Sequence, residues 1–453
     1  MSGQRPNVII IGAGLTGSLL AIHLARRGYQ VDVFEQRSEV RKAPQDKKRT
    51  IAMSLSYRGV KALEEVGLAA TLLGRSTPTF GRITHSISGD THKQFYGRED
   101  EAIYTINRKV LNVALIEQAA RCDSFRIHYN AELESIDFGQ KTATILEDGE
   151  RRTYAYDCLF GADGVFSKSR REHERLLGIA PQLERLPIGY KEFTIPTDMV
   201  SDQGWEDTFV HVWPADDANF VALPSRDQQI FIGNLFCTNE WVEFFGNRPG
   251  KQEIIDLLGT RFPQLTGILN RLDEACFLEN SANIYMTRSP HWSYENSFLL
   301  LGDAIHAMAP FYAMGMNMCL EDCSQFNRLL DQNGDDLADA VTRFQGLRKA
   351  DVDAMQRISL RNFQTLSESS ESGFESEWRM DRLLSETCPE HWITESALIS
   401  FRDVPISRVE ELVKRQHQFV ARHQLSYDAL LQKAPAEVTA LCEEIRTLFP
   451  LSQ

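Results

Sequence analysis

The sequence of 453 residues lacks three kinds of pattern. No stretch comes near the run of about eighteen apolar residues that a membrane-spanning helix needs. The eight cysteines are scattered, without a C-x-x-C pair or histidines at zinc spacing. No cleavable apolar leader precedes the first apolar strand pattern. We therefore expect a cytoplasmic protein with reduced cysteines, no metal and no membrane contact.

The sequence also has too few basic residues for a nucleic-acid-binding protein. Its 49 Lys and Arg face 63 Asp and Glu, which gives a net charge of −14. Binding of many phosphates requires clustered positive charge, so we expect a small-molecule substrate and no nucleic acid. No linker rich in proline, glycine or serine separates parts of the chain, so we expect closely packed, interwoven domains. A monomer and a homodimer both remain open.

Residues 7–35 form a strand, glycine turn, helix and second strand pattern. Gly12, Gly14 and Gly17 make up G-x-G-x-x-G in the turn, and Glu35 ends the second strand. Such glycines let a pyrophosphate approach the helix N-terminus, and the acid accepts ribose hydroxyls. A glycine turn with only a structural role would not need the following helix, the second strand and the acid at its end. We therefore predict a site for FAD or NAD, since an acid at this position disfavours a 2′-phosphate.

Two later clusters also follow apolar strand patterns. Asp163 and Gly164 stand in LFGADGVFSKSR, where a structural Asx turn is the alternative to a functional role. In LLLGDAIHAMAPFYAMGMN, a strand delivers Asp303, and Gly315, Met316 and Asn317 open a helix. An acid beside the ribityl chain and a helix N-terminus at the flavin would stabilise reduced flavin. His306, just past Asp303, is expected to cap backbone groups rather than to act in catalysis.

The rest of the chain divides by its periodicity. Helices are expected within 54–74 and 107–122, and short strands between 125 and 161. The run from 188 to 236 predicts a separate antiparallel sheet that covers the substrate, and everything after about Leu337 is expected to be helix-rich.

The three clusters, in this order and spacing, resemble those of flavin hydroxylases similar to p-hydroxybenzoate hydroxylase. The resemblance implies FAD rather than NAD, with NADPH binding transiently and no second nucleotide-binding unit. It implies an α/β fold in which a Rossmann-like FAD-binding domain is interwoven with an antiparallel β-sheet substrate domain and a helical C-terminal region. We place the FAD-binding domain at 1–180 and 285–335, with 75–105 contributing to the substrate site. The substrate domain is placed at 181–284 and the helical region at 336–453.

Between these clusters the sequence is similar to the kynurenine 3-monooxygenase family over nearly its whole length, through RTIAMSLSYRGVKAL, INR, GYKE, HVWP, GDAIHAMAPF and GMNMCLED. The resemblance implies that Arg82 pairs with the substrate carboxylate, because two parallel charge-assisted hydrogen bonds suit an arginine. Tyr96 and Asn362 would support Arg82, and Phe311 would pack beside the substrate ring. The expected FAD contacts are Gly12, Gly14, Leu15, Gly17, Glu35, Arg37, Arg108, Asp303, Gly315, Met316 and Asn317.

The resemblance implies an enzyme that hydroxylates L-kynurenine to 3-hydroxykynurenine with NADPH and O2, without an acid or base side chain. Three positions depart from the family pattern: Ala313 and Met314 replace a Gly-Gln pair, and Ser396 stands where a tyrosine joins the carboxylate contacts. Tryptophan or another indole- or anthranilate-type acid is therefore the alternative substrate. A flavin oxidase or dehydrogenase and a non-catalytic scaffold are further alternatives. A flavin halogenase is disfavoured because the chain lacks W-x-W-x-I-P.

Overall fold

A six-stranded, mostly parallel sheet carries the N-terminal glycine turn in the computed structural model, which describes residues 6–39, 52–277, 281–368, 373–389 and 391–448. Only its edge strand runs antiparallel to its neighbour. The central strands are continuous apolar runs, as expected for strands that are buried on both faces. In spatial order the strands are β18 (Ser293–Tyr294), β19 (Phe298–Leu300), β12 (Cys158–Gly161), β1 (Asn7–Ile11), β2 (Gln30–Glu35) and β8 (Phe125–Tyr129).

Seven helices belong to this part of the fold: α1 (Leu15–Arg26), α2 (Tyr57–Glu65), α3 (Ala69–Leu73), α4 (Arg108–Ala119), α5 (Lys168–Leu177), α10 (Asp303–His306) and α11 (Gly315–Asn333). Helix α1 is buried along almost its whole length because it packs between β2, α4 and α11. The helices expected within 54–74 and 107–122 are confirmed. Asn107 caps α4, since its side chain accepts hydrogen bonds from the N–H groups of Lys109 and Val110.

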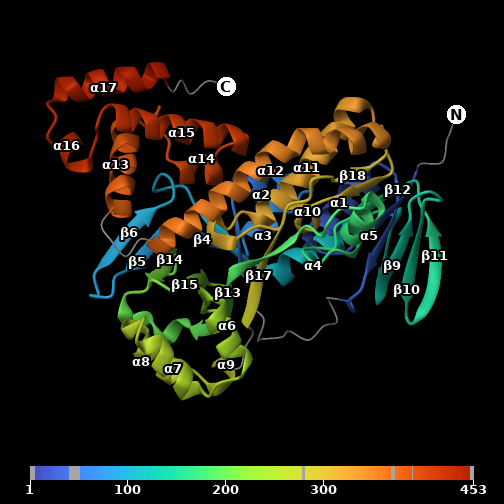
Figure 1. Cartoon of the computed structure of the whole chain (residues 1–453), viewed down its shortest axis with the longest axis horizontal. Helices are drawn as coiled ribbons and strands as arrows, with labels where there is room; N and C mark the ends of the chain where they lie inside the picture. Colours follow the sequence, from blue (N-terminus) through green and yellow to red (C-terminus); the bar gives the residue numbers. More distant parts are fainter. Residues whose placement is uncertain (1–5, 40–51, 278–280, 369–372, 390, 449–453) are drawn as a thin grey trace.

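Two small antiparallel sheets flank the parallel one. One consists of β3 (Ala52–Leu55), β7 (Ile103–Asn107) and β4 (Thr77–Thr79). The other consists of β9 (Ala131–Asp137), β10 (Thr142–Glu147) and β11 (Glu150–Ala155), and it forms one end of the molecule (Figure 1). His128 of β8 joins this end sheet to the parallel sheet, because its ring nitrogens lie 3.0 Å from Asp32 and 3.0 Å from Glu147.

A seven-stranded sheet occupies the middle of the chain. Its order is β17 (Ser281–Thr287), β13 (Leu183–Pro196), β16 (Ile230–Thr238), β15 (Ala218–Ser225), β14 (Phe209–Pro214), β5 (Gly81–His85) and β6 (Thr91–Phe95). The expected strands between 188 and 236 are present, but their sheet is not separate from the N-terminal region. Strand β5 pairs in parallel with β14, with Val210 opposite Arg82, so an early hairpin completes the sheet.

One face of this sheet packs on α6 (Asn239–Gly246), α7 (Lys251–Gly259), α8 (Thr266–Arg271) and α9 (Glu274–Phe277). Short 3-10 turns accompany these elements: η1 (Thr197–Met199), η2 (Ser201–Gln203) and η3 (Pro263–Leu265). The core between them is rich in aromatic residues, including Phe193, Trp213 and Phe220. Large rings bury much apolar area each and stabilise this layer.

The described residues after 336 are mostly helical, as expected: α12 (Leu337–Glu368), α13 (Gly373–Thr387), α14 (Glu395–Phe401), α15 (Ile406–Arg422), α16 (Tyr427–Leu431) and α17 (Pro435–Leu448). Helices α13–α17 gather at the end of the molecule opposite β9–β11 (Figure 1). Within the described residues, no helix combines the length and the apolar character that crossing a membrane requires.

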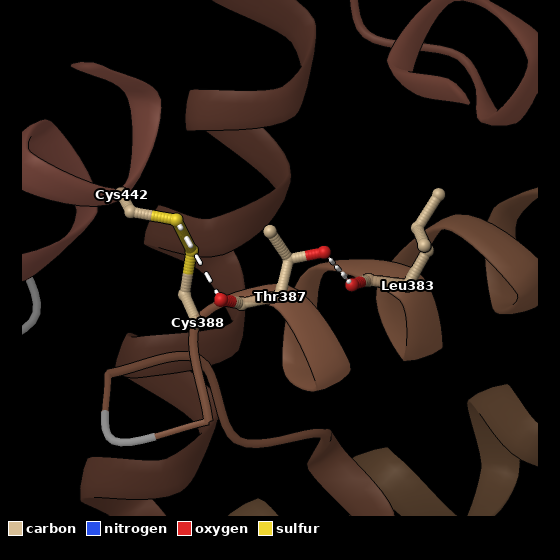
Figure 2. The surroundings of a disulfide bond; sticks show 4 residues. All are labelled: Leu383, Thr387, Cys388 and Cys442. Carbon is tan, nitrogen blue, oxygen red and sulfur yellow. Dashed lines mark hydrogen bonds between the residues drawn. A yellow bond between two sulfur atoms is a disulfide. The ribbon is translucent and has the colours of Figure 1, made fainter. Parts of the chain in front are cut away.

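A disulfide within this helical region corrects the expectation of reduced cysteines. Figure 2 shows Cys388, at the end of α13, bonded to Cys442 of α17. The other six cysteines are free. The two partners lie 54 positions apart, and sequence spacing could not pair them because helix packing brings them together.

Candidate active site

The glycine turn between β1 and α1 places three glycines in different surroundings. Gly12 has φ +99°, and a Cβ there would lie 2.6 Å from the Ala162 carbonyl oxygen. A Cβ on Gly17 would lie 1.9 Å from the Gly12 carbonyl oxygen. Both positions therefore exclude a side chain. A Cβ on Gly14, which precedes α1, would meet nothing within 4 Å. This open side of a helix N-terminus fits a ligand pyrophosphate.

Glu35 is held against the glycine turn. Its carboxylate accepts hydrogen bonds from the Ala13 N–H at 3.0 Å and from the Arg37 N–H and Nε, each at 2.9 Å. Burial works to raise the pKa of Glu35, but these hydrogen bonds and the Arg37 charge outweigh it and hold the pKa below its usual value. Glu35 is thus an ionised acceptor of the kind that binds a ribose hydroxyl in dinucleotide sites.

Two further expected FAD contacts flank the turn. Leu15 is the first residue of α1 and is buried. Arg108 is the first residue of α4, and the Asn112 side chain of that helix donates to the Ala13 carbonyl at 3.0 Å. Arg108 is exposed and forms no hydrogen bond or ion pair with other described residues. It is therefore available to a bound anion.

Asp163 of the D-G turn has a structural role. Its carboxylate accepts hydrogen bonds from the N–H groups of Lys168 and Ser169 and from the hydroxyl of Ser167, so it caps the N-terminus of α5. Arg170 of the same helix donates to the Ala304 carbonyl at 2.7 Å. The turn and its helix thereby support the loop that carries Asp303.

Asp322 of α11 forms hydrogen bonds with the loop around Asp303. One oxygen of Asp322 lies 2.6 Å from His306 Nε2 and 3.2 Å from the Gly302 N–H, and Arg348 Nε donates to the other at 3.0 Å. The expectation that His306 caps backbone groups is therefore wrong, because Nε2 bonds a buried carboxylate. Burial works to raise the pKa of Asp322, but His306 and Arg348 hold it below its usual value.

The N-terminus of α11 adjoins this loop. The Asn317 side chain is fully engaged, since it accepts from the Ser56 N–H at 2.9 Å and donates to the carbonyls of Ser54 and Ala313. Asn317 can therefore meet a ligand only through its backbone N–H. The backbone N–H groups of Gly315 and Met316 are also available, because the first turn of a helix leaves its N–H groups without intrahelical partners. Ala313 precedes the helix with φ +53° in the left-handed region.

Arg82 and Tyr96 come together at the β5–β6 hairpin. Arg82 Nε donates to Gln94 Oε1 across the strands at 2.6 Å. His85, on the other face of β5, stacks on Trp213 in the aromatic core, so Arg82 points away from that core. Burial lowers the pKa of Arg82, and Tyr96 and Tyr312 oppose this effect. Burial also raises the pKa of Tyr96 to about 12, against the influence of Arg82.

Phe311 and Asn362 meet at the 3-10 turn η4 (Pro310–Tyr312). The Asn362 side chain donates to the Phe311 carbonyl at 2.5 Å, so it supports the turn directly. The Phe311 ring lies 5.4 Å from the Phe236 ring, within a small apolar cluster. The segment 303–317 thus carries Asp303 at its start and Phe311 near its middle, in the turn before α11.

Tyr312 and Asp381 are neighbours of this site that were not expected from the sequence, whereas Ser396 was named as a departure from the family pattern. Tyr312 interacts electrostatically with Arg82, and burial raises the pKa of Tyr312 well above its usual value. Ser396, at the position of the missing tyrosine, donates to the Tyr96 carbonyl at 2.8 Å. Asp381 of α13 interacts with Tyr312 as well. No sequence signal marks Asp381, because it belongs to a helix far along the chain and to no motif.

Comparison with known proteins identifies the relatives of this chain. The family model described as FAD binding domain matches residues 5–332. The chain is 34% identical to kynurenine 3-monooxygenase of Salinispora tropica over 93% of both chains. It is 31% identical to kynurenine 3-monooxygenase of Legionella pneumophila (strain Corby), over 89% of this chain and 90% of the other.

Solved structures share the fold at lower identity. The tetrameric form of 2-methyl-3-hydroxypyridine-5-carboxylic acid oxygenase superposes with a TM-score of 0.65 at 20% identity, over 82% of this chain and 95% of that one. PqsL of Pseudomonas aeruginosa in complex with 2-aminobenzoylacetate gives 0.62 at 19% identity, over 80% and 97%. The α/β architecture with interwoven sheets is thus the fold of these flavin enzymes.

Proposed function

The chain belongs to the kynurenine 3-monooxygenases within the FAD-binding domain family, and from this premise we propose that it converts L-kynurenine to 3-hydroxykynurenine. It is an FAD-dependent monooxygenase that uses NADPH and O2. Its substrate is an aromatic amino acid. The observation that carries the assignment of the substrate site is the half-buried Arg82 near Tyr96, on the face of β5 opposite the aromatic core.

The proposed FAD site uses the glycine turn, the acid that follows β2 and the loop before α11. The open space over Gly14, the ionised Glu35 and the available Arg108 fit an adenosine diphosphate group. The proposed contacts are Gly12, Gly14, Leu15, Gly17, Glu35, Arg37, Arg108, Asp303, Gly315, Met316 and Asn317, the last through its backbone. We assign 1–180 and 285–335 to FAD binding, 181–284 with 75–105 to the substrate site, and 336–453 to the helical region.

Bound FAD supplies the redox and oxygen-activating steps of the reaction. The chain itself must fix the substrate and exclude water, because misplacement by about 1 Å can lower a rate by two orders of magnitude. In our proposal Arg82 and Tyr96 hold the substrate carboxylate, and Phe311 packs beside the ring on the turn that Asn362 supports. No side-chain base is needed, since the aniline nitrogen of kynurenine already donates electrons to the ring.

The decisive experiment is NADPH oxidation by the FAD-loaded protein with and without L-kynurenine, with product masses read from the same samples. We expect stimulated oxidation and a product one oxygen atom heavier, with the label retained from ¹⁸O₂. Stimulation by tryptophan or anthranilate but not by L-kynurenine would replace the substrate assignment. A product without labelled oxygen would instead indicate an oxidase or dehydrogenase.

A further inference from the structure

Asp381 is a partly buried carboxylate that, within the described part of the chain, has no lysine or arginine paired with it. It is half-buried in α13, and Trp392 Nε1 donates to its Oδ1 at 2.6 Å. Burial raises the pKa of Asp381 to about 6, with Glu395 adding to the shift. A carboxylate in such surroundings is costly unless a cation reaches it.

The elements around Asp381 converge on the proposed substrate site. Helix α13 reaches the end of β6, where Arg382 lies 5.4 Å from the centre of the Phe95 ring, and Tyr96 is the next residue. Helix α14 reaches the same place, since Ser396 donates to the Tyr96 carbonyl at 2.8 Å. In Figure 1 helix α13 stands next to β6.

Tyr312 connects the two charges of this region. Burial chiefly raises the pKa of Tyr312, and the Arg82 and Asp381 charges act on it in opposite directions. Glu395 is the other carboxylate that interacts with this ring, but it is ion-paired with Arg361. Of these two carboxylates, Asp381 is therefore the one without an ion-pair partner among the described residues.

Resting on the proposed function, we propose that Asp381 accepts the α-ammonium group of the substrate while Arg82 binds its carboxylate. The site then recognises both charges of an amino acid. Aromatic acids without an amino group would leave Asp381 unpaired, so the enzyme discriminates against them. An ammonium group would restore the cation that the surroundings of Asp381 lack, and charge-assisted hydrogen bonds are among the stronger polar contacts.

The test compares L-kynurenine with 4-(2-aminophenyl)-4-oxobutanoate, which lacks only the α-amino group. For the FAD-loaded wild type we expect a KM about tenfold or more lower for L-kynurenine. In Asp381→Asn, which retains an acceptor for Trp392, the KM for L-kynurenine should rise by about ten- to a hundredfold. The KM for the oxobutanoate should change by less than about twofold, as should both values in the control Asp428→Asn, an exposed residue of α16.

The outcomes separate this inference from the proposed function. Equal effects of Asp381→Asn on both compounds, or no effect on either, would overturn the role of Asp381 even if L-kynurenine is hydroxylated. Binding of the two compounds is also followed by the change in flavin absorbance, so the same comparison holds if turnover fails. If Asp381→Asn does not retain FAD, the wild type alone decides: equal affinity for both compounds rejects the inference.

Discussion

At the scale of single residues, Arg82 is a cation whose surroundings oppose its charge. Burial lowers the pKa of Arg82, and two phenol rings only partly counteract this. Its Nε donates a hydrogen bond to Gln94, which orients the guanidinium, and its charge acts on Tyr312. A substrate carboxylate would complete this arrangement.

Replacement of Arg82 by alanine should therefore raise the KM for L-kynurenine by about one to two powers of ten, the effect of losing about 1.5 to 3 kcal/mol of charge-assisted hydrogen bonding. Steady-state NADPH oxidation measures this effect. Arg98→Ala is the matched control, because Arg98 is exposed beyond β6 and its ion pairs are with Asp100 and Glu101 of the same turn. An unchanged KM in Arg82→Ala would remove Arg82 from the substrate site.

Sequence reasoning reached those residues whose roles depend on local chain geometry. Gly12 and Gly17 sit where a Cβ would collide with backbone, and such positions leave a fixed pattern. Asp381 and Tyr312 could not be found in this way, because their importance arises from charges that other elements bring to them. The partner of His306 was missed for the same reason: its Nε2 bonds Asp322, which belongs to the separate helix α11, and not the backbone groups that we expected.

At the scale of elements, His128 couples β2, β8 and β10. Hydrogen bonding to Asp32 chiefly raises the pKa of His128, against burial, and Glu147 adds to the rise. For Asp32, burial acts to raise the pKa, but His128 and Arg126 lower it to about 2. Protonated His128 thus stabilises the folded protein. This contribution is complete below the ordinary histidine pKa of about 6.5 and is lost as the pH rises through the raised value.

His128→Gln should consequently lower the melting temperature by about 2 °C at pH 5.5 and by less at pH 9. Thermal unfolding followed by circular dichroism at both pH values measures the difference from the wild type. His417→Gln, an exposed substitution in α15, serves as the control and should show a small difference at either pH. A larger effect of His128→Gln at pH 9 would contradict the proposed coupling.

The positions of helices and strands were easier to predict from the sequence than the pairing between strands. Continuous apolar runs marked β1 and β12, and helical periodicity marked α4, because such patterns arise among a few neighbouring residues. The parallel pairing of β5 with β14 joins segments more than a hundred positions apart, and no local periodicity encodes it. The sequence therefore indicated a substrate sheet but not the strands that complete it.

At the scale of the whole molecule, the Cys388–Cys442 bond closes the C-terminal helical region, which also carries Asp381. Thiol titration of the unfolded protein without reductant should count six free thiols rather than eight. Reduction should destabilise the region by about 2 to 4 kcal/mol, the usual effect of a bond that closes a long loop. Cys388→Ser should reproduce the loss, whereas Cys122→Ser, which removes a free thiol, should not. A count of eight thiols would show that the bond does not form.

The pairing of β5 with β14 also bears on how such an enzyme can change by recombination. A crossover anywhere between residues 96 and 208 would take Arg82 and Tyr96 from one parent and β14 from the other. In the chimera, β5 of one parent would have to pair with β14 of the other, although the two strands did not evolve together. The proposed substrate site thus depends on two segments that are far apart in the sequence. Gene shuffling should succeed most readily when β5, β6 and β14 come from the same parent.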